Sequence, residues 1–211
     1  MDDAQGVREE IKRRNRAGKG VLIIIGSKEF RHGTGRSLIA RTLAKAIGAK
    51  HFSTGDEFRQ MARKKHMSIN EYATYAEHHL EIDREFDEKT QKDVKALIDS
   101  GKNVVADSNL LAHFLKADAS IVIDAPDEIR AERVYAKHRS ADAKFSCPKD
   151  ALEHLASRDE SDRKRYEKLY GVDADKLTES YDFYVENRGE LHESMDQVFK
   201  GLKEKLLHGK H

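Results

Sequence analysis

A short run of small, hydroxylated and cationic residues, Gly33-Thr34-Gly35-Arg36-Ser37, stands between an apolar stretch and a stretch with helical spacing. The backbone N–H groups of such a loop, with the start of the following helix, form a concave surface that binds phosphate oxygens. The Ser37 hydroxyl takes the place of the group that holds Mg²⁺ in phosphate-binding loops. We therefore expect a phosphate site formed by Gly33, Thr34, Gly35, Arg36, Ser37 and Leu38.

The loop departs in two ways from the usual pattern, G-x-x-x-x-G-K-[ST]. Eight residues separate Gly26 from Gly35, and Phe30 stands where the first glycine is expected. Arg36 replaces the lysine, and its planar guanidinium is bulkier than an ammonium group. Taken alone, the segment fits either a degenerate phosphate loop or a glycine-rich turn that caps a helix.

A second candidate cluster lies later in the chain, at Arg158, Asp162 and Arg165. At helical spacing these three side chains fall on one face, so that two guanidinium groups flank a carboxylate. Arginine binds phosphate in a bidentate manner, and a carboxylate can orient it or bind a sugar hydroxyl. The alternative is a solvated helix stabilised by ion pairs.

The elements that must position these residues alternate along the chain. Residues 21–25 are apolar without alternation, which is typical of a strand buried on both faces. Further strands are predicted over 103–107, 119–124 and 181–186, and helices over 37–47, much of 54–99, 126–138, 148–169 and 190–207. Strands that alternate with helices predict an α/β fold with a parallel sheet covered by helices.

Composition sets limits on the class of protein. The chain has 211 residues, a net charge of +1 and a single cysteine, Cys147. This favours one domain over 20–211, preceded by a polar extension over 1–19, in a reducing compartment. The longest apolar run, 21–25, is far too short for a bilayer. We expect a cytoplasmic monomer that binds neither membrane nor nucleic acid, with 1–19 forming a solvated helix.

Ordered sequence blocks carry a resemblance over most of the chain. They comprise residues 51–59, 67–72, 81–87, 123–133, 158–166 and 170–173. With the phosphate loop, they resemble the archaeal type of cytidylate kinase, within the P-loop nucleoside monophosphate kinases. The resemblance spans about 21–187 and leaves out the N-terminal extension.

The resemblance implies a three-layer P-loop kinase fold with a five-stranded parallel sheet, a helical acceptor-binding insert at about 54–100 and a lid at about 139–165. It implies phosphoryl transfer from ATP with Mg²⁺ to CMP, dCMP or a related small acceptor. Arg133 and Arg139 are candidates for contact with ATP. The implied catalytic residues are Arg36, Arg158 and Arg165, the acceptor-binding residues are Ser53, Arg59, Asn109, Asp162 and Arg163, and the Mg²⁺ residues are Ser37 and Asp107.

One more departure concerns charge. After the strand at 103–107 the family typically carries an arginine that binds the acceptor, and this chain has Asn109. One hypothesis is that Arg31, in the lengthened loop, supplies some of the missing charge. Three functions stay open: an active kinase, a nucleotide-binding module with little or no activity, and a nucleic-acid-binding protein that uses 1–19.

Overall fold

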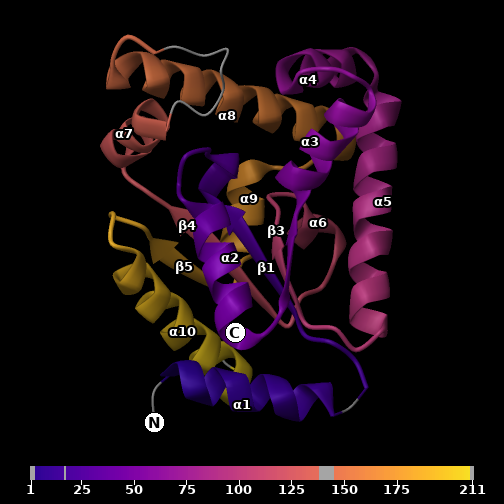
Figure 1. Cartoon of the computed structure of the whole chain (residues 1–211), viewed down its shortest axis with the longest axis vertical. Helices are drawn as coiled ribbons and strands as arrows, with labels where there is room; N and C mark the ends of the chain where they lie inside the picture. The colour runs from indigo at the N-terminus through magenta and orange to yellow at the C-terminus, as the bar shows by residue number, and fades with distance from the viewer. Residues whose placement is uncertain (1–2, 17, 138–144, 210–211) are drawn as a thin grey trace.

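The computed structural model describes residues 3–16, 18–137 and 145–209. Its centre is a five-stranded parallel sheet with the order β2-β3-β1-β4-β5, as Figure 1 shows. This confirms the predicted sheet. The strands are β1 (Leu22–Ser27), β2 (Lys50–Ser53), β3 (Val104–Asp107), β4 (Ala119–Asp124) and β5 (Phe183–Glu186). The sequence placed β1 one residue too early and ended it before Gly26 and Ser27, which continue the strand.

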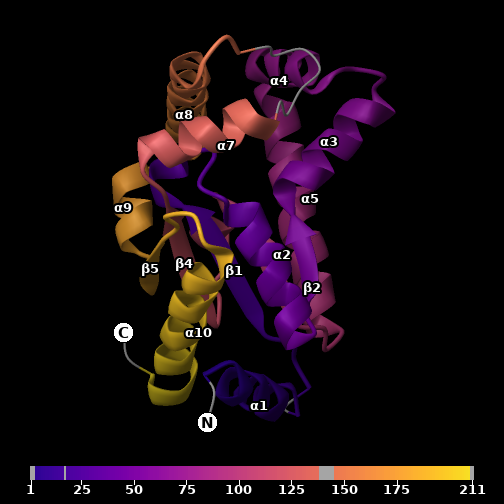
Figure 2. The same ribbon diagram turned by 60° about the vertical axis from the view of Figure 1, so that its left-hand side comes forward.

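Helices cover both faces of the sheet and the carboxyl ends of its strands (Figures 1 and 2). One face packs against α1, α2 and α10, and the other against α5 and α6. Residues 23–25 of β1 are fully buried between these layers, which explains the unbroken apolar run. The bounds are α1 (Asp3–Asn15), η1 (Lys28–Phe30), α2 (Arg36–Ile47), α3 (Thr54–Lys64), α4 (Ile69–His78), α5 (Leu80–Asp99), α6 (Leu111–Phe114), α7 (Asp127–Lys137), α8 (Pro148–Tyr170), α9 (Ala174–Glu179) and α10 (Leu191–His208).

The N-terminal extension differs from the solvated helix that we expected. Val7 and Ile11 of α1 are buried in the main core, at the end of the sheet opposite α7 and α8. Arg14 donates to the Leu206 carbonyl (2.8 Å) and contacts Asp118 (3.1 Å). Polar residues occupy the other face of α1. Because they outnumber the apolar residues, the short apolar stripe that packs against the core was not recognised in the sequence.

The predicted insert over 54–100 consists of three helices, α3, α4 and α5. Ser68 and Glu71 form the predicted capping box at the start of α4. Of the predicted lid, 139–144 and Arg139 lie outside the described residues. Its remainder belongs largely to α8, a continuous helix that lies across the carboxyl ends of the strands with α7 beside it (Figure 2). No helix in the described ranges has both the length and the apolar character needed to cross a membrane.

Candidate active site

The phosphate loop connects β1 to α2, and its extra length forms a short 3₁₀ turn. Phe30 in this turn is buried and packs edge-on against Tyr166 of α8, with ring centroids 5.2 Å apart. Gly35 then takes a left-handed conformation (φ 84°), where a Cβ atom would come within 2.3 Å of the Asn187 amide nitrogen. A side chain is therefore excluded at Gly35, and the glycine fixes the direction in which α2 begins.

The loop offers backbone donors at the start of α2. In the described part of the chain, the N–H groups of Gly33, Gly35, Arg36 and Ser37 have no hydrogen-bond partner. Such N–H groups at a helix start bind anions, as the sequence predicted for this loop. Leu38 is the exception among the six predicted residues, because its N–H already donates to the Gly35 carbonyl (3.0 Å).

The cation of the loop, Arg36, extends toward the end of β3. Its Nε donates to Asp107 Oδ1, and its NH1 group donates to the Asn109 side-chain oxygen. NH1 also lies 3.4 Å from Ser27 Oγ at the end of β1. The two positions at which this chain departs from the family's cationic residues, Arg36 for lysine and Asn109 for arginine, are therefore in direct contact.

Asp107 is the buried carboxylate of the site, with 1% of its surface exposed. Burial raises the pKa of Asp107, but the Arg36 guanidinium and the Ser37 hydroxyl lower it more, so that the pKa lies below its usual value. Ser53 Oγ lies 3.4 Å from Asp107 Oδ2. The structure thus brings Ser37 and Asp107 together, and both supply the hard oxygen donors that Mg²⁺ prefers.

The other side of the loop contacts α7 and α8. Asp159 of α8 accepts a hydrogen bond from the His32 N–H (2.7 Å) and is paired with Arg130 of α7. Arg130 Nε in turn donates to the His32 carbonyl (2.7 Å). Further along the loop, the Thr34 carbonyl accepts from Arg133 (3.0 Å) and from Asn187 (2.9 Å). The second half of the loop is therefore fixed through its backbone.

The α8 residues predicted from spacing are in place, but they differ in environment. Arg165 donates to Asp162 Oδ1 (2.8 Å) and lies 3.4 Å from Asp83 of α5. Burial raises the pKa of Asp162, but His32, Arg165 and Arg158 outweigh it and lower the pKa to about 2. Arg158 is exposed and makes no hydrogen bond with the described residues. The cluster is therefore not a solvated helix face, because two of its members join α8 to the loop and to α5.

Two residues predicted to bind an acceptor phosphate have other partners. Arg59 is half exposed and pairs with Asp56 of its own helix. Arg163 contacts Glu29 of the 3₁₀ turn at 3.1 Å. Ser53, the third residue on this side, caps α3 by accepting from the Asp56 N–H (3.3 Å). The Arg59 guanidinium is thus engaged within its own helix in this structure.

Arg31 corrects another expectation. Its guanidinium lies between Asp124, at 2.6 Å, and Asp127, with which it also pairs. Two carboxylates already neutralise this charge. Arg31 therefore fixes the loop to β4 and α7, and these ion pairs argue against the hypothesis that it supplies a missing phosphate-binding charge.

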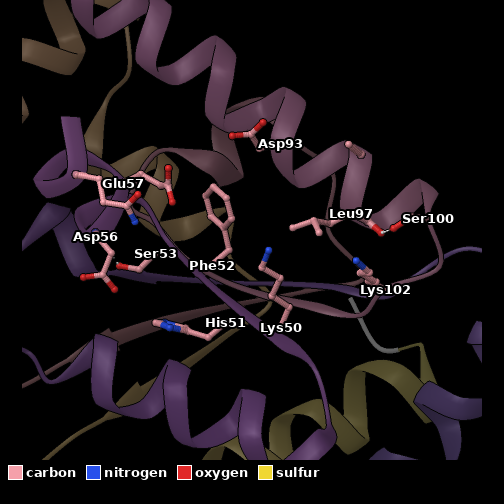
Figure 3. A pocket seen from close by; sticks show the side chains of 12 residues that line it. Lys50, His51, Phe52, Ser53, Asp56, Glu57, Asp93, Leu97, Ser100 and Lys102 are labelled. Carbon is pink, nitrogen blue, oxygen red and sulfur yellow. Dashed lines mark hydrogen bonds between the residues drawn. The ribbon is translucent and has the colours of Figure 1, made fainter. Parts of the chain in front are cut away.

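A cavity of about 570 Å³ runs along β2 between α3 and α5, as Figure 3 shows. It includes Ser53 and Asp56 from the predicted acceptor side, but no residue of the phosphate loop. Lys50 and Lys102 lie at one end, and Glu57 and Asp93 line the side formed by the helices. The cavity therefore adjoins the candidate site, but neither Arg36 nor its partners Asp107 and Asn109 line it.

Comparison with known proteins decides the family. The chain is 39% identical to a cytidylate kinase of Pyrococcus abyssi over 169 residues, which is 80% of this chain and 86% of the relative. It is 36% identical to a cytidylate kinase of Pyrococcus furiosus over 191 residues, covering 90% and 91%. The chain belongs to the cytidylate kinase family. A family profile described as an AAA domain also matches residues 31–147.

Membership of the cytidylate kinase family makes this chain a phosphotransferase of the nucleoside monophosphate kinase type. A solved structure supports the fold alone: shikimate kinase from Acinetobacter baumannii aligns with a TM-score of 0.50 at 15% identity, covering 93% of this chain and 98% of that one. The resemblance inferred from the sequence blocks is thus confirmed.

Three residues that shape the loop of this kinase were not predicted from its sequence: Arg130, Asp159 and Asn187. Asn187 directly follows the last strand, at the carboxyl end where parallel sheets bind ligands, and this position was a usable signal. Arg130 and Asp159 gave no such signal, because each looks like one charge among many on a polar helix.

Proposed function

We propose that this chain transfers the γ-phosphoryl group of ATP to CMP, dCMP or a closely related monophosphate. The observation that carries the proposal is the arrangement of Arg36, Ser37 and Asp107 at the carboxyl ends of β1 and β3. The cytidylate kinase relatives support the choice of a cytidine nucleotide. Phosphoryl transfer needs positioning and positive charge more than covalent chemistry, and this site supplies both.

In this proposal the phosphate loop binds the donor. The free N–H groups of Gly33, Gly35 and Ser37 donate to phosphate oxygens. The Ser37 hydroxyl and the Asp107 carboxylate are the residues that would hold Mg²⁺. The metal would neutralise charge on the phosphates. The described residues contain no group of three or more His, Cys, Asp or Glu that could hold a metal ion without the nucleotide.

On the acceptor side, Ser53 and Arg59 face the monophosphate, and Arg59 leaves Asp56 to do so. Asp162, ionised well below neutral pH, orients Arg165 and accepts from sugar hydroxyls. Arg158 and Arg165 add positive charge from α8 as the phosphoryl group moves. Each of these roles rests on the family relationship and on the position of the element that carries the residue.

The test is phosphoryl transfer from ATP and Mg²⁺ to CMP, dCMP, UMP, AMP, GMP and dTMP, with products resolved by chromatography. We expect a diphosphate product from CMP or dCMP. Calorimetric titration with ATP accompanies the assay. Retained ATP binding without transfer to any acceptor would overturn the proposal in favour of a nucleotide-binding module, for which Arg36 in place of lysine is the motivating feature.

A further inference from the structure

The Arg36 side chain extends from the phosphate loop toward one half of the sheet. The loop follows β1, the central strand, with β3 and β2 on one side and β4 and β5 on the other. Both anchors of the guanidinium, Asp107 and Asn109, lie at or just after the end of β3. The charge of Arg36 is therefore directed toward β3 and β2, away from β4 and β5.

Hydrogen bonds hold the Asn109 side chain in this arrangement. Its side-chain oxygen accepts from the Ser27 N–H (2.9 Å), from Ser27 Oγ (2.8 Å) and from Arg36 NH1. Its amide nitrogen lies 3.5 Å from the Phe30 carbonyl. The residue is 8% exposed. An amide so engaged cannot turn toward a substrate without losing these bonds, so Asn109 acts on the reaction through the groups that it holds, and Arg36 is the charged one among them.

Arg36 retains one group that no described residue binds. Nε and NH1 are held by Asp107 and Asn109, whereas no hydrogen bond joins NH2 to the described part of the chain. A guanidinium anchored by two of its nitrogen atoms presents the third in a fixed direction. Arginine binds phosphate through such N–H groups.

The neighbours of Arg36 on this side belong to the acceptor half of the site. In the sheet, Ser53 of β2 is paired in register with Asp107. Thr54, the first residue of α3, donates to the Asp107 carbonyl (3.2 Å). The end of β3 that anchors Arg36 is thus the same end that supports Ser53 and the start of α3.

We propose that Asn109 is a positioning residue that holds Arg36 so that its NH2 group binds the phosphate of the acceptor. This inference rests on the proposed function and deepens it, because it assigns recognition of the acceptor phosphate to a residue of the phosphate loop. The ligand class follows: a nucleoside monophosphate binds here, whereas the corresponding nucleoside lacks the group that Arg36 recognises.

The test compares Asn109→Ala, Arg36→Lys and the double variant. Calorimetry gives the Kd of CMP and of a non-hydrolysable ATP analogue for each protein, and steady-state assays give both KM values. We expect each single variant to weaken CMP binding about tenfold or more, as for loss of a charge-assisted hydrogen bond, and ATP-analogue binding less than threefold. The double variant should be no weaker for CMP than Arg36→Lys alone, because Asn109 acts through Arg36.

Asn187→Ala is the matched control on the opposite side of the loop. It removes a buried asparagine that donates to the Thr34 carbonyl, and we expect it to weaken binding of the ATP analogue more than binding of CMP. If Asn109→Ala fails to fold, Ser27→Ala removes one donor to the Asn109 oxygen and should weaken CMP binding about two- to fivefold.

Three results would overturn the inference: equal losses for CMP and for the ATP analogue, multiplicative losses in the double variant, or unchanged CMP binding in both single variants. Failure of the proposed function is distinguishable. It would appear as absence of transfer by the wild-type protein, whereas the ratio of the two Kd values is measured without turnover.

Discussion

On the β3 side of the phosphate loop the contacts meet at the guanidinium of Arg36, whereas on the α8 side the loop backbone is held at His32 and Thr34. The β3 side consists of Ser27, Arg36, Asp107 and Asn109, at the ends of central strands. The α8 side consists of His32, Thr34, Arg130, Arg133, Asp159 and Asn187, contributed by the loop, α7, α8 and the chain after β5.

The difference shows how a lengthened loop can keep a fixed path while the guanidinium of Arg36 keeps a fixed direction. Contacts to backbone groups set the path of the loop whatever its side chains are, so the α8 side determines shape. Contacts to a guanidinium determine where its charge lies, so the β3 side determines chemistry. Changes on the α8 side should therefore reduce stability, and changes on the β3 side should reduce turnover.

The largest effect is expected for Asp159→Ala, which removes a buried partner of Arg130 and the acceptor of the His32 N–H. Arg130 keeps its contact with Asp127 (2.7 Å). Loss of its buried partner, together with a His32 N–H left without an acceptor, should still cost about 3 kcal/mol of unfolding free energy. Urea denaturation measures it. Glu160→Ala, next to it on α8 but exposed and, among the described residues, paired with Lys164 alone, should cost less than about 1 kcal/mol. A similar small loss for both variants would show that the α8 side does not stabilise the fold.

Arg36→Lys should give the second largest effect, now on catalysis. A lysine carries its three donors on a single nitrogen, which cannot occupy the separate positions that Nε, NH1 and NH2 of Arg36 take, so kcat should fall about 100-fold, or about 2.7 kcal/mol. The unfolding free energy should change far less. Arg41→Lys, an exposed position on the same helix, is the control and should keep full activity. Unchanged kcat in Arg36→Lys would show that an ammonium group serves as well as the anchored guanidinium, and would break the comparison.

Asp87→Asn tests the end of α8 remote from the loop, where Tyr170 donates to Asp87 of α5 (2.8 Å). Burial, with help from Asp83, raises the pKa of Asp87 to about 6, although the Tyr170 hydrogen bond opposes this. The folded state therefore binds this proton more tightly than the unfolded state, and stability falls as pH rises from about 4 to about 6.

Removing this carboxylate should raise the unfolding free energy by about 1–3 kcal/mol at pH 8 and leave it unchanged near pH 4. Denaturation at both pH values checks the prediction. Asp93→Asn, at a half-exposed position of the same helix where the carboxylate pairs with Lys89, should change stability by less than about 1 kcal/mol at either pH. A variant that is no more stable at pH 8 would contradict the assignment of a raised pKa.

The smallest effect is expected for Arg31→Ala. Because Asp124 and Asp127 already pair with Arg31, ATP affinity should change less than about threefold, and calorimetric titration measures it. A tenfold weaker ATP affinity would instead support the hypothesis that Arg31 supplies phosphate-binding charge, and would move part of the chemistry to the α8 side.

Local patterns predicted much of this architecture. The apolar run of β1, the capping box at Ser68 and the glycine stop at Gly48 each depend on interactions within a few residues. The short helix α9 was missed, although Asp173 caps it by accepting from two backbone N–H groups. With only six residues, α9 shows too little apolar periodicity to be recognised from the sequence.

The site was predicted less completely, because its decisive contacts join residues far apart in the chain. The sequence marks Arg36 and Asn109 as unusual, but it does not show that they touch across 73 positions. Likewise, Asp159 looks like one more charge on a polar helix until the fold places it against His32. Partnerships of this kind depend on topology, which spacing along the chain does not encode.

Helix α8 runs unbroken for 23 residues, a rod of about 35 Å. Near its middle Asp159 holds the phosphate loop, and at its carboxyl end Tyr170 holds α5 (Figure 1). A rigid rod fastened at two points transmits a tilt from one to the other. We therefore expect occupancy of the loop and the position of the insert to be thermodynamically linked, so that a donor bound at the loop and an acceptor bound at the insert would change each other's affinity by the same factor.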